Sequence, residues 1–382
     1  MKVLQRYFVD EISRSILFVL AAFLALFAFY DLTGEIKVLG RGGYQLHQAF
    51  LYVLLGLPSE VYVLMPVAAL IGTIWALAQF AARSEFTIMR VSGMSTAKAG
   101  WMLAKIGMVF VMLTFILGEI VAPVASEMAE KMKLRAQGAS VSQAFRSGWW
   151  AKDVIKQNGV SGEAIGSRFL NVREVRPDGE LRGVRLYEFD LDFRMTALIT
   201  AARANYQGEH VWRLSDVSIT HFPNLAMGAG MQAPNLDGTV SASTLPSKEL
   251  VSEITPAILS VLFAKPERMS AYNLLLYTRH LAENKQHTDR YEIAFWKKLV
   301  YPFAVLVMMA LALPFAYMHV RAGGVSLKIF IGIMIGVSFQ LLNGLFSHLG
   351  LLNTWPPLAT AVAPSALFLL LALGALWRVE RR

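Results

Sequence analysis

Long runs of apolar residues divide this chain into two groups that flank a more polar middle. The runs cover about 16–32, 50–82, 101–124, 299–318, 329–350 and 358–377. A helix that crosses a bilayer needs roughly 20 apolar residues, and each run is close to that length or exceeds it. The pattern predicts six transmembrane helices, three before the middle region and three after it.

The second run is longer than one span requires. Glu60 with Pro58 and Pro66 interrupts it, and neither half is long enough to cross a bilayer alone. We therefore expect one long helix there, tilted or kinked, instead of two short spans.

In the middle region, from about 140 to 250, short segments rich in β-forming residues alternate with Gly, Asn, Asp and Pro. These segments are 168–172, 183–189, 196–201, 210–214 and 217–222. Short strands at close spacing favour a β-sandwich or a jellyroll-like pair of sheets. The predicted fold class is a membrane α-helical protein of six transmembrane helices, with a β-jellyroll-like domain inserted between transmembrane helices 3 and 4.

Residues 266–287 follow a helical pattern instead. After Pro266, apolar residues recur at helical spacing, and Asn284 stands near the end of the pattern. We expect an amphipathic helical connector that leads back to the membrane. The predicted domains are 1–124 (transmembrane helices 1–3), 125–290 (the β-rich domain and its connector) and 291–382 (transmembrane helices 4–6).

Lysine and arginine in the short flanks of the runs predict the orientation, because cytoplasmic loops carry an excess of both. Loops on one side hold only Lys37 and Arg41 in 33–48, and none in 351–357. The flanks on the other side hold many: Lys2, Arg6, Arg14, Arg83, Arg90, Lys98, Lys105, Arg321, Lys328, Arg378, Arg381 and Arg382. Both termini are thus predicted to be cytoplasmic and the β-rich domain to lie outside, and the absence of cysteine suits a periplasmic location of that domain. A cleavable signal peptide is disfavoured for the first run, which lacks a clean small-residue cleavage site.

Composition narrows the possible chemistry. With 55% hydrophobic and 16% charged residues, the chain suits a lipid environment. The net charge of +9 is distributed beside apolar runs and not along a basic stripe, so we expect no nucleic-acid partner. There is no cysteine, the seven histidines lack metal-ligand spacing, and neither a GxxxxGK[ST] loop nor a GxSxG elbow occurs. We therefore expect no metal and no cofactor in this chain, and any ATP and Mg²⁺ that its function needs would be bound by another subunit.

The loop between the second and third runs, residues 83–95, is the most informative. Phe86 and Met89, together with Arg90, share one face of a short amphipathic helix beside Glu85, and Gly93 suits its C-cap. Apolar knobs with one carboxylate fit a groove on a partner protein. An interfacial turn with solvated charges explains the local pattern equally well.

Several motifs occur in a specific order along the chain. They are RSEFTIMRVSGMS at 83–95, MPVAAL at 65–70, Gly118-Glu119 followed by Ala122-Pro123, WAKD at 150–153 and VWRL at 211–214. With the order of spans and domain, they resemble the LptG-type lipopolysaccharide-export permeases of the YjgP/YjgQ family over nearly the whole chain. Residues 154–166 look like an insertion relative to that family.

The resemblance implies a permease subunit of an ATP-driven ABC transporter in the bacterial inner membrane. Such a transporter extracts lipopolysaccharide from the outer leaflet of that membrane and passes it to a periplasmic bridge. The resemblance also implies three partners, the sister permease LptF, a dimer of the LptB ATPase, and LptC. It further implies that 83–95 is the coupling helix seated in the ATPase, with Glu85 as its acidic contact and Phe86, Met89 and Arg90 on the same face.

Lipopolysaccharide carries phosphates, which attract basic side chains. Candidates at the outer-leaflet level are Lys131, Lys133 and Arg135 after the third run, and Lys297 with Lys298 before the fourth. Arg135 is the strongest, because Arg135-Ala136-Gln137 also matches the family pattern. Solvated helix ends, or contacts with any anionic headgroup of the membrane lipids, are the alternative for these residues.

Two further readings compete with lipopolysaccharide export. A lipoprotein-release or mechanotransmitting ABC subunit would have four spans, with its domain after the first. A secondary lipid transporter would show repeats with broken helices and ionisable groups at the membrane midplane, and the sequence shows neither clearly. The aromatic residues Trp150, Phe169, Tyr187, Phe189 and Trp212 either contact acyl chains or form the core of the domain, and the core is the expected role for any one of them.

Overall fold

The computed structural model describes residues 2–137, 148–176, 179–222, 240–260, 266–317 and 324–380. Arg321, Arg381 and Arg382, which were used to predict the orientation, lie outside these ranges. In the described part of the chain, six helical segments are long and apolar enough to cross a membrane, as the sequence predicts. They are Gln5–Ile36, Leu46–Ala82, Thr96–Ala136, Asp289–Ala316, Val325–Leu352 and Pro357–Val379.

The first three spans are built from α1 (Lys2–Ile36), α2 (Leu46–Ala82) and the continuous rod α4 (Thr96–Ile116), η2 (Leu117–Val121) and α5 (Ala122–Ala136). A short turn, η1 (Arg41–Gly43), joins α1 to α2, and α3 (Glu85–Val91) joins α2 to α4. Helix α2 continues through Pro58 and Pro66, which confirms the prediction of one long helix.

The last three spans begin with α8 (Asp289–Val300), η6 (Tyr301–Phe303), α9 (Ala304–Ala312) and η7 (Leu313–Ala316), which form one segment. Helices α10 (Val325–Leu352) and α11 (Pro357–Glu380) follow. Helix α2 lies at the centre and contacts α1, α5, α9 and α10. At Gly72 a Cβ atom would lie 2.5 Å from the Cα of Ile16, so only glycine permits this close crossing of α1 and α2.

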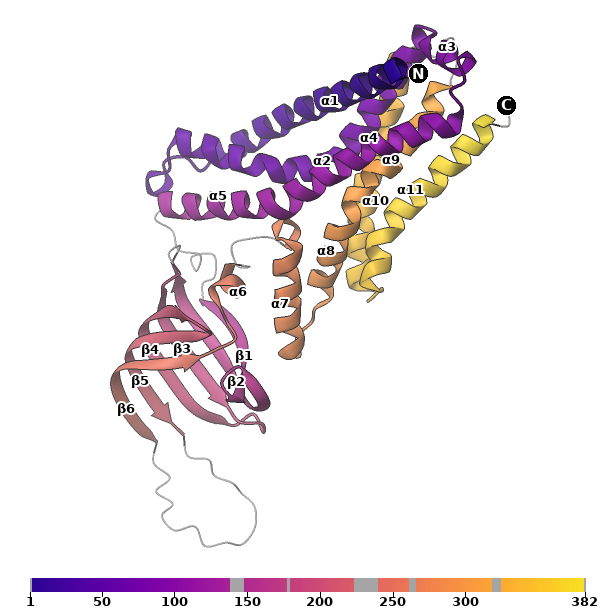
Figure 1. Ribbon diagram of the computed structural model, residues 1–382. Coiled ribbons are helices and arrows are strands. Elements are labelled where there is room, and N and C mark those ends of the chain that lie inside the picture. The colour runs from indigo at the N-terminus through magenta and orange to yellow at the C-terminus, as the bar shows by residue number, and fades with distance from the viewer. Residues whose placement is uncertain are drawn as a thin grey trace.

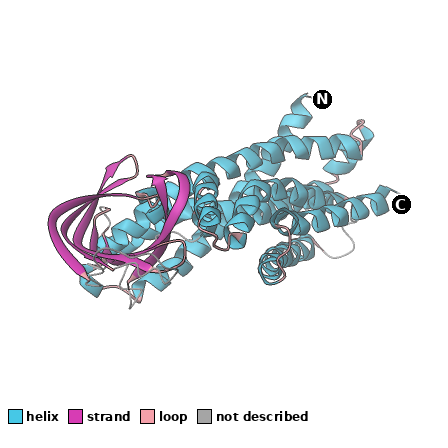
Figure 2. Cartoon of the chain, turned by 90° about the horizontal axis from the view of Figure 1, so that it is seen from below, coloured by secondary structure: helices cyan, strands magenta, loops and turns pink. Residues whose placement is uncertain are grey.

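The middle region folds into one antiparallel sheet between α5 and α6 (Pro256–Ser260). Its strands are β1 (Trp149–Asn158), β2 (Ser161–Val175), β3 (Leu181–Phe189), β4 (Met195–Gly208), β5 (Val211–His221) and β6 (Ser241–Val251). Their order in the sheet is their order in the chain. The jellyroll prediction is not confirmed, because the described strands form a single meander that curves around its own core (Figure 2).

The strands are longer than the predicted segments. Segments 210–214 and 217–222 join into β5. Asp216 between them has a φ of 55°, but the pairing with β4 keeps the same register on both sides of it. The β4–β5 turn is two residues, Glu209 and His210, both with positive φ, as a tight hairpin requires. The proposed insertion at 154–166 forms the tip of the β1–β2 hairpin.

One face of the sheet forms its core. Two cross-strand rows of buried side chains run along it, one of Leu170, Leu186, Ile199 and Ile219 and the other of Val172, Val184, Ala201 and Val217. Strand alternation places residues 169, 171, 185 and 187 on the opposite face.

Three short helical elements lead from the sheet back to the helices: α6, η5 (Pro266–Arg268) and α7 (Ala271–Glu283). Helix α7 stands between the sheet and the long helices (Figure 1). Helix α3 and both ends of the chain lie at one extremity of the molecule and the sheet at the other. A partner at α3 and a partner at the sheet would therefore contact the chain at opposite ends.

Candidate functional site

Helix α3 is a seven-residue helix that is closed by a Schellman motif. The amide of Met94 donates to the carbonyl of Met89 at 3.1 Å, and the amide of Gly93 donates to that of Arg90 at 3.0 Å. Gly93 has a φ of +91°, as the glycine at this position requires. The Nζ of Lys98, on α4, donates to the Gly93 carbonyl at 3.0 Å and ties the end of α3 to the next helix.

The buried face of α3 packs on the chain itself. Phe86 is 3% exposed and Met89 is 2% exposed, and both belong to the apolar core of the helices. The ring of Phe86 meets that of Tyr317 edge-on, with centroids 5.1 Å apart, and the Tyr317 hydroxyl donates to Thr96 at 2.9 Å. Helix α3 is thereby packed against the residue that follows η7, at the end of the fourth span.

The outer face of α3 carries different residues. Ile88 is 63% exposed and Val91 86% exposed. The guanidinium of Arg90 lies 5.2 Å from the centre of the Tyr317 ring. Glu85 is half-buried, accepts a hydrogen bond from the Tyr7 hydroxyl at 3.2 Å, and lies 3.9 Å from Arg83.

The prediction that Phe86 and Met89 are knobs for a partner's groove therefore needs correction. Their side chains are almost completely buried against the chain's own helices, so they do not project from α3 as knobs for a partner's groove. The apolar residues left for a partner are Ile88 and Val91. Phe86 and Met89 instead anchor α3.

The basic residues predicted to bind phosphate do not form one cluster. On α5, Lys131 pairs with Glu127 at 2.6 Å, and Lys133 pairs with Glu35 at 2.6 Å. The Nζ of Lys133 also lies 4.4 Å from the centre of the Tyr52 ring. Lys133 is thus held between α1 and α2 as a structural residue, whereas Lys131 lies in an exposed pair.

Arg135 is exposed in the last turn of α5. Among the described residues no carboxylate forms an ion pair with its guanidinium. Of the five basic candidates it is therefore the one most free to bind a phosphate.

Lys297 and Lys298 lie on α8 beside a pocket of about 210 Å³ between α2, α8 and α10. The Nζ of Lys297 donates to the Ser347 hydroxyl at 2.9 Å. Lys298 is 5% exposed, and its Nζ lies 4.9 Å from the centre of the Tyr62 ring. The two lysines line a cavity instead of projecting to the surface, so a phosphate would have to enter the cavity to meet them.

The aromatic candidates divide between the two faces of the sheet. Trp212 is 3% exposed in the core, and its Nε1 donates to the Ile254 carbonyl at 2.7 Å. On the opposite face, Trp150 stacks on Tyr187 at 5.5 Å, and Phe169 meets Phe189 edge-on at 5.6 Å. Only Trp212 has the core role expected for each of the five.

The N-terminal end of helix α7 is bound by an acidic side chain of the third span. The carboxylate of Glu119, in the π-helical η2, accepts hydrogen bonds from the backbone amides of Ala271 and Tyr272 at 2.8 Å and 3.4 Å. These amides have no partner within the helix, and a carboxylate there also complements the helix dipole. Glu119 therefore fixes α7 to the membrane-spanning rod, a contact that the sequence did not reveal.

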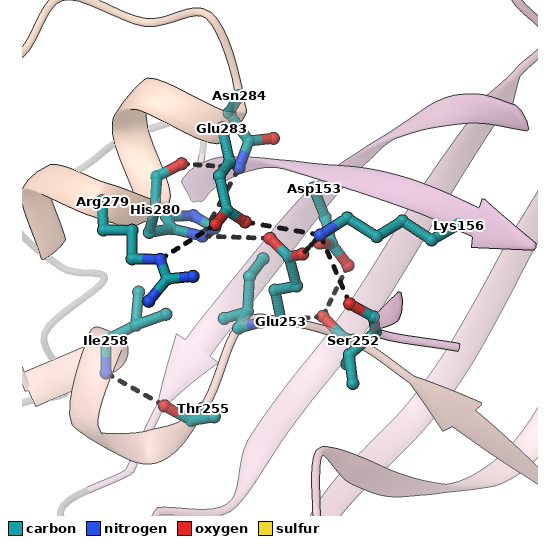
Figure 3. A network of polar contacts seen from close by, with 12 residues as sticks. Asp153, Lys156, Ser252, Glu253, Thr255, Ile258, Arg279, His280, Glu283 and Asn284 are labelled. Atoms are coloured by element: carbon teal, nitrogen blue, oxygen red, sulfur yellow. Dashed lines mark hydrogen bonds and ion pairs between the residues drawn. The ribbon is translucent and has the colours of Figure 1, made fainter. Parts of the chain in front are cut away.

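The C-terminal end of α7 is held by the sheet through a network of polar residues (Figure 3). Lys156 of β1 pairs with Glu253 and, at 3.4 Å, with Glu283 of α7. The Nδ1 of His280 lies 3.8 Å from Glu253, and the Nζ of Lys152 donates to the Asn284 carbonyl at 3.2 Å. The same corner continues to Asp153, which accepts from the Ser252 hydroxyl at 2.6 Å and lies 3.6 Å from Arg168.

The titration of this network follows from its burial and charges. The hydrogen bond to Glu253 raises the pKa of Lys156 against the opposing effect of burial. Burial lowers the pKa of His280, although the carboxylates of Asp153, Glu253 and Glu283 act in the other direction. His280 is thus neutral near pH 7, and the network gains its net attraction from Lys156 and the arginines.

The sequence also matches known proteins over nearly its whole length. The model of the family described as "Lipopolysaccharide export system permease LptF/LptG" matches residues 6–378. Lipopolysaccharide export system permease protein LptG of Escherichia coli K12 is 31% identical over 377 residues, 98% of each chain. The protein of the same name from Haemophilus influenzae is 28% identical over 369 residues, 96% of each chain.

The six spans and these relatives bear on the competing readings. A lipoprotein-release subunit would have four spans with its domain after the first, whereas here the sheet follows the third of six. The match extends across both helical halves and the sheet. The chain therefore belongs to the LptF/LptG family of lipopolysaccharide export system permeases.

Proposed function

We propose that this chain is the permease subunit of an ATP-driven exporter that extracts lipopolysaccharide from the outer leaflet of the bacterial inner membrane. The observation that carries the proposal is the full-length match to permeases of lipopolysaccharide export systems. In this proposal α3 and both termini face the cytoplasm, and the sheet faces the periplasm. The opposite positions of α3 and the sheet support that orientation (Figure 1).

Three partners complete the proposed transporter: the sister permease LptF, a dimer of the LptB ATPase that binds ATP and Mg²⁺, and LptC. Exposed apolar side chains on α1 and α10, including Phe18, Phe29 and Leu341, support a cavity shared with LptF or open to lipid. The meander leaves β1 and β6 as edge strands, and a further strand from LptC or a periplasmic bridge would pair with such an edge.

Helix α3 is the proposed link to the ATPase. Ile88 and Val91 would fill its groove, while Glu85 and Arg90 would make its charged contacts. Phe86 and Met89 would transmit the motion, because they are packed in the core against Tyr317 and the end of the fourth span. A buried aromatic contact moves as a unit with the helix that carries it.

Arg135 is the proposed first contact with a lipid phosphate, with Lys131 as a weaker exposed neighbour. A guanidinium binds phosphate through two parallel hydrogen bonds, and Arg135 has no competing ion pair among the described residues. Lys297 and Lys298 would contact lipid only if it enters the pocket between α2, α8 and α10.

Charge reversal at Glu85 tests the assignment. In proteoliposomes containing the whole complex, Glu85→Lys should abolish lipopolysaccharide-stimulated ATP hydrolysis and lipid release while the protein stays inserted. Glu163→Lys, an exposed reversal on β2, is the matched control and should leave both activities unchanged. Normal lipid release by Glu85→Lys would refute the role of α3.

The phosphate contact is tested separately. Arg135→Glu should weaken photo-crosslinking of lipopolysaccharide to the complex and the stimulation of ATPase activity by lipid. Arg173→Glu, on the exposed side of β2, is the control. Unchanged crosslinking by Arg135→Glu would count against Arg135 but would leave the role of α3 standing.

A further inference from the structure

A second cavity lies at the opposite end of the molecule from the sheet. It has a volume of about 190 Å³ and is formed by the first turns of α1, the end of α3 and the first three turns of α4. Its lining is Gln5, Val9, Met89, Ser92, Met94, Lys98, Trp101, Met102 and Lys105. The lining thus combines apolar and thioether side chains with two lysines and contains no acid.

The charged and aromatic residues of this cavity follow one face of α4. Lys98, Trp101 and Lys105 recur at spacings of three and four, so they stand above one another on the helix. Trp101 is 65% exposed, and the Nζ of Lys105 lies 5.6 Å from the centre of its ring. Among the described residues no carboxylate pairs with either lysine, and Lys98 binds only the Gly93 carbonyl at 3.0 Å.

The same face continues into the membrane as an apolar stripe. Met108, Val109 and Met112 follow Lys105 and are 46%, 67% and 64% exposed. Tryptophan and lysine at the end of a span mark the headgroup level, where the ring is amphipathic and the amine extends toward the interface. The exposed stripe beyond them lies at the depth of the acyl chains.

This arrangement matches one ligand in charge and in shape. We propose that the cavity between α1, α3 and α4 binds an acidic phospholipid of the leaflet on the α3 side, with its phosphate between Lys98 and Lys105. Its acyl chains lie along Met108 and Met112. Because Met89 and Met94 of the α3 cap form part of the lining, the bound lipid supports the end of α3.

The proposal is independent of the transported lipid. It needs only a membrane on the α3 side and a leaflet that contains anionic phospholipid, such as phosphatidylglycerol. Two lysines near a charged lipid surface should give a preference for the acidic lipid on the order of thirtyfold, which corresponds to about 2 kcal/mol.

Quenching of Trp101 by brominated lipids tests this site. The whole complex is placed in phosphatidylcholine nanodiscs that contain rising fractions of brominated phosphatidylglycerol or brominated phosphatidylcholine. The difference between the wild type and Trp101→Phe isolates one of the eight tryptophans. Half-quenching should need on the order of thirtyfold less brominated phosphatidylglycerol than brominated phosphatidylcholine.

Two variants test whether Lys98 and Lys105 cause the preference for phosphatidylglycerol. Lys98→Gln with Lys105→Gln should remove it, whereas Lys37→Gln, which removes one charge at the other end of α1, should keep it. Equal quenching by both lipids in the wild type, or a preference that survives loss of both lysines, would overturn the proposal. Quenching seen for the chain alone but lost in the complex would show that a protein covers the cavity, and it too would overturn the proposal.

Discussion

Helices α3 and α7 are attached to the rest of the chain by opposite kinds of contact. At one end α3 is fixed by apolar side chains, with Phe86 and Met89 almost completely buried against the helices. Between the sheet and the long helices, α7 is fixed by charges, through Glu119 at its start and through Lys156, Glu253 and Glu283 at its end. The first joint is insensitive to salt and pH, whereas the second depends on both.

This difference fits the functions proposed for α3, which contacts the ATPase, and for the sheet, which receives the lipid. A helix that receives a push from a motor must move with the span beneath it, and a close-packed aromatic contact has few alternative arrangements. A domain that receives a lipid from the membrane must change its angle, and a partly exposed ionic network can exchange partners at low cost. In this proposal the contact that fixes α3 to the fourth span is rigid and lies at the ATPase side, whereas the contact that fixes α7 to the sheet can rearrange and lies at the lipid-receiving side.

The contact that fixes α3 should show the largest effect. Phe86→Ala removes a buried ring and should destabilise α3 by about 3 to 5 kcal/mol, which raises amide exchange across 85–91 by two or more powers of ten. Hydrogen exchange with mass spectrometry measures this, at low and at high salt alike. Ile88→Ala, at an exposed position of the same helix, should leave exchange unchanged; equal effects of the two variants would mean that α3 is not anchored by its buried face.

A buried charge beside the contact that fixes α7 to the sheet should come next. Asp153 is 1% exposed and lies beside Arg168, whose other contacts are Glu188 and the Val251 carbonyl. Asp153→Ala removes one of the two carboxylates near the buried guanidinium of Arg168. It should lower the free energy of opening, measured by hydrogen exchange of the β1, β2 and β6 amides, by about 3 kcal/mol. The exposed Asp192→Ala is the control, and unaltered protection in Asp153→Ala would show that the corner is held by packing alone.

The partly exposed pairs should matter less. Lys156→Gln breaks the pairs with Glu253 and Glu283. It should weaken the attachment of α7 to the sheet by about 1 kcal/mol at low salt, and most of this difference between the wild type and the variant should disappear at 1 M salt. A spin-label distance between α7 and β1 reports the loosening. If salt leaves the difference between wild type and variant intact, the joint is not electrostatic.

The smallest effect should come from pH. The folded pKa of His280 lies below its ordinary value of 6.5, so the network has its full stability above about pH 6.5 and loses part of it as the pH falls through the interval down to the folded pKa. His280→Gln should abolish that loss, whereas His287→Gln, at a fully exposed position, should keep it. If the stability of wild type and His280→Gln depends on pH in the same way, His280 does not contribute to the pH dependence of the network.

The sequence predicted the features that depend on local pattern. Hydropathy found the six spans of the described residues and the continuity of α2, because a helix that crosses a bilayer must be apolar along about 20 residues. Gly93 marked the end of α3, because its positive φ is a local requirement. Segments rich in β-forming residues, separated by Gly, Asn, Asp and Pro, marked four of the six described strands, β2 to β5.

The rest depends on contacts between distant segments. Helix α3 carries apolar residues on both faces. Packing against distant segments, such as that of Phe86 on Tyr317, buries Phe86 and Met89 and leaves Ile88 and Val91 exposed. Glu119 is 152 residues from Ala271, so nothing near it predicts its role at α7. Strand β6 was missed because it is a polar edge strand with Pro246 and Lys248, which resemble a loop in composition.

Single-cysteine labelling tests the central claim, that α3 and the sheet lie on opposite sides of the membrane. The chain has no cysteine of its own, so Val91→Cys on α3 and Asp192→Cys in the β3–β4 loop each give one thiol. A membrane-impermeant maleimide added to intact spheroplasts should label Asp192→Cys at once, and Val91→Cys only after the membrane is opened. Labelling of Val91→Cys in intact spheroplasts, with Asp192→Cys protected, would contradict the account.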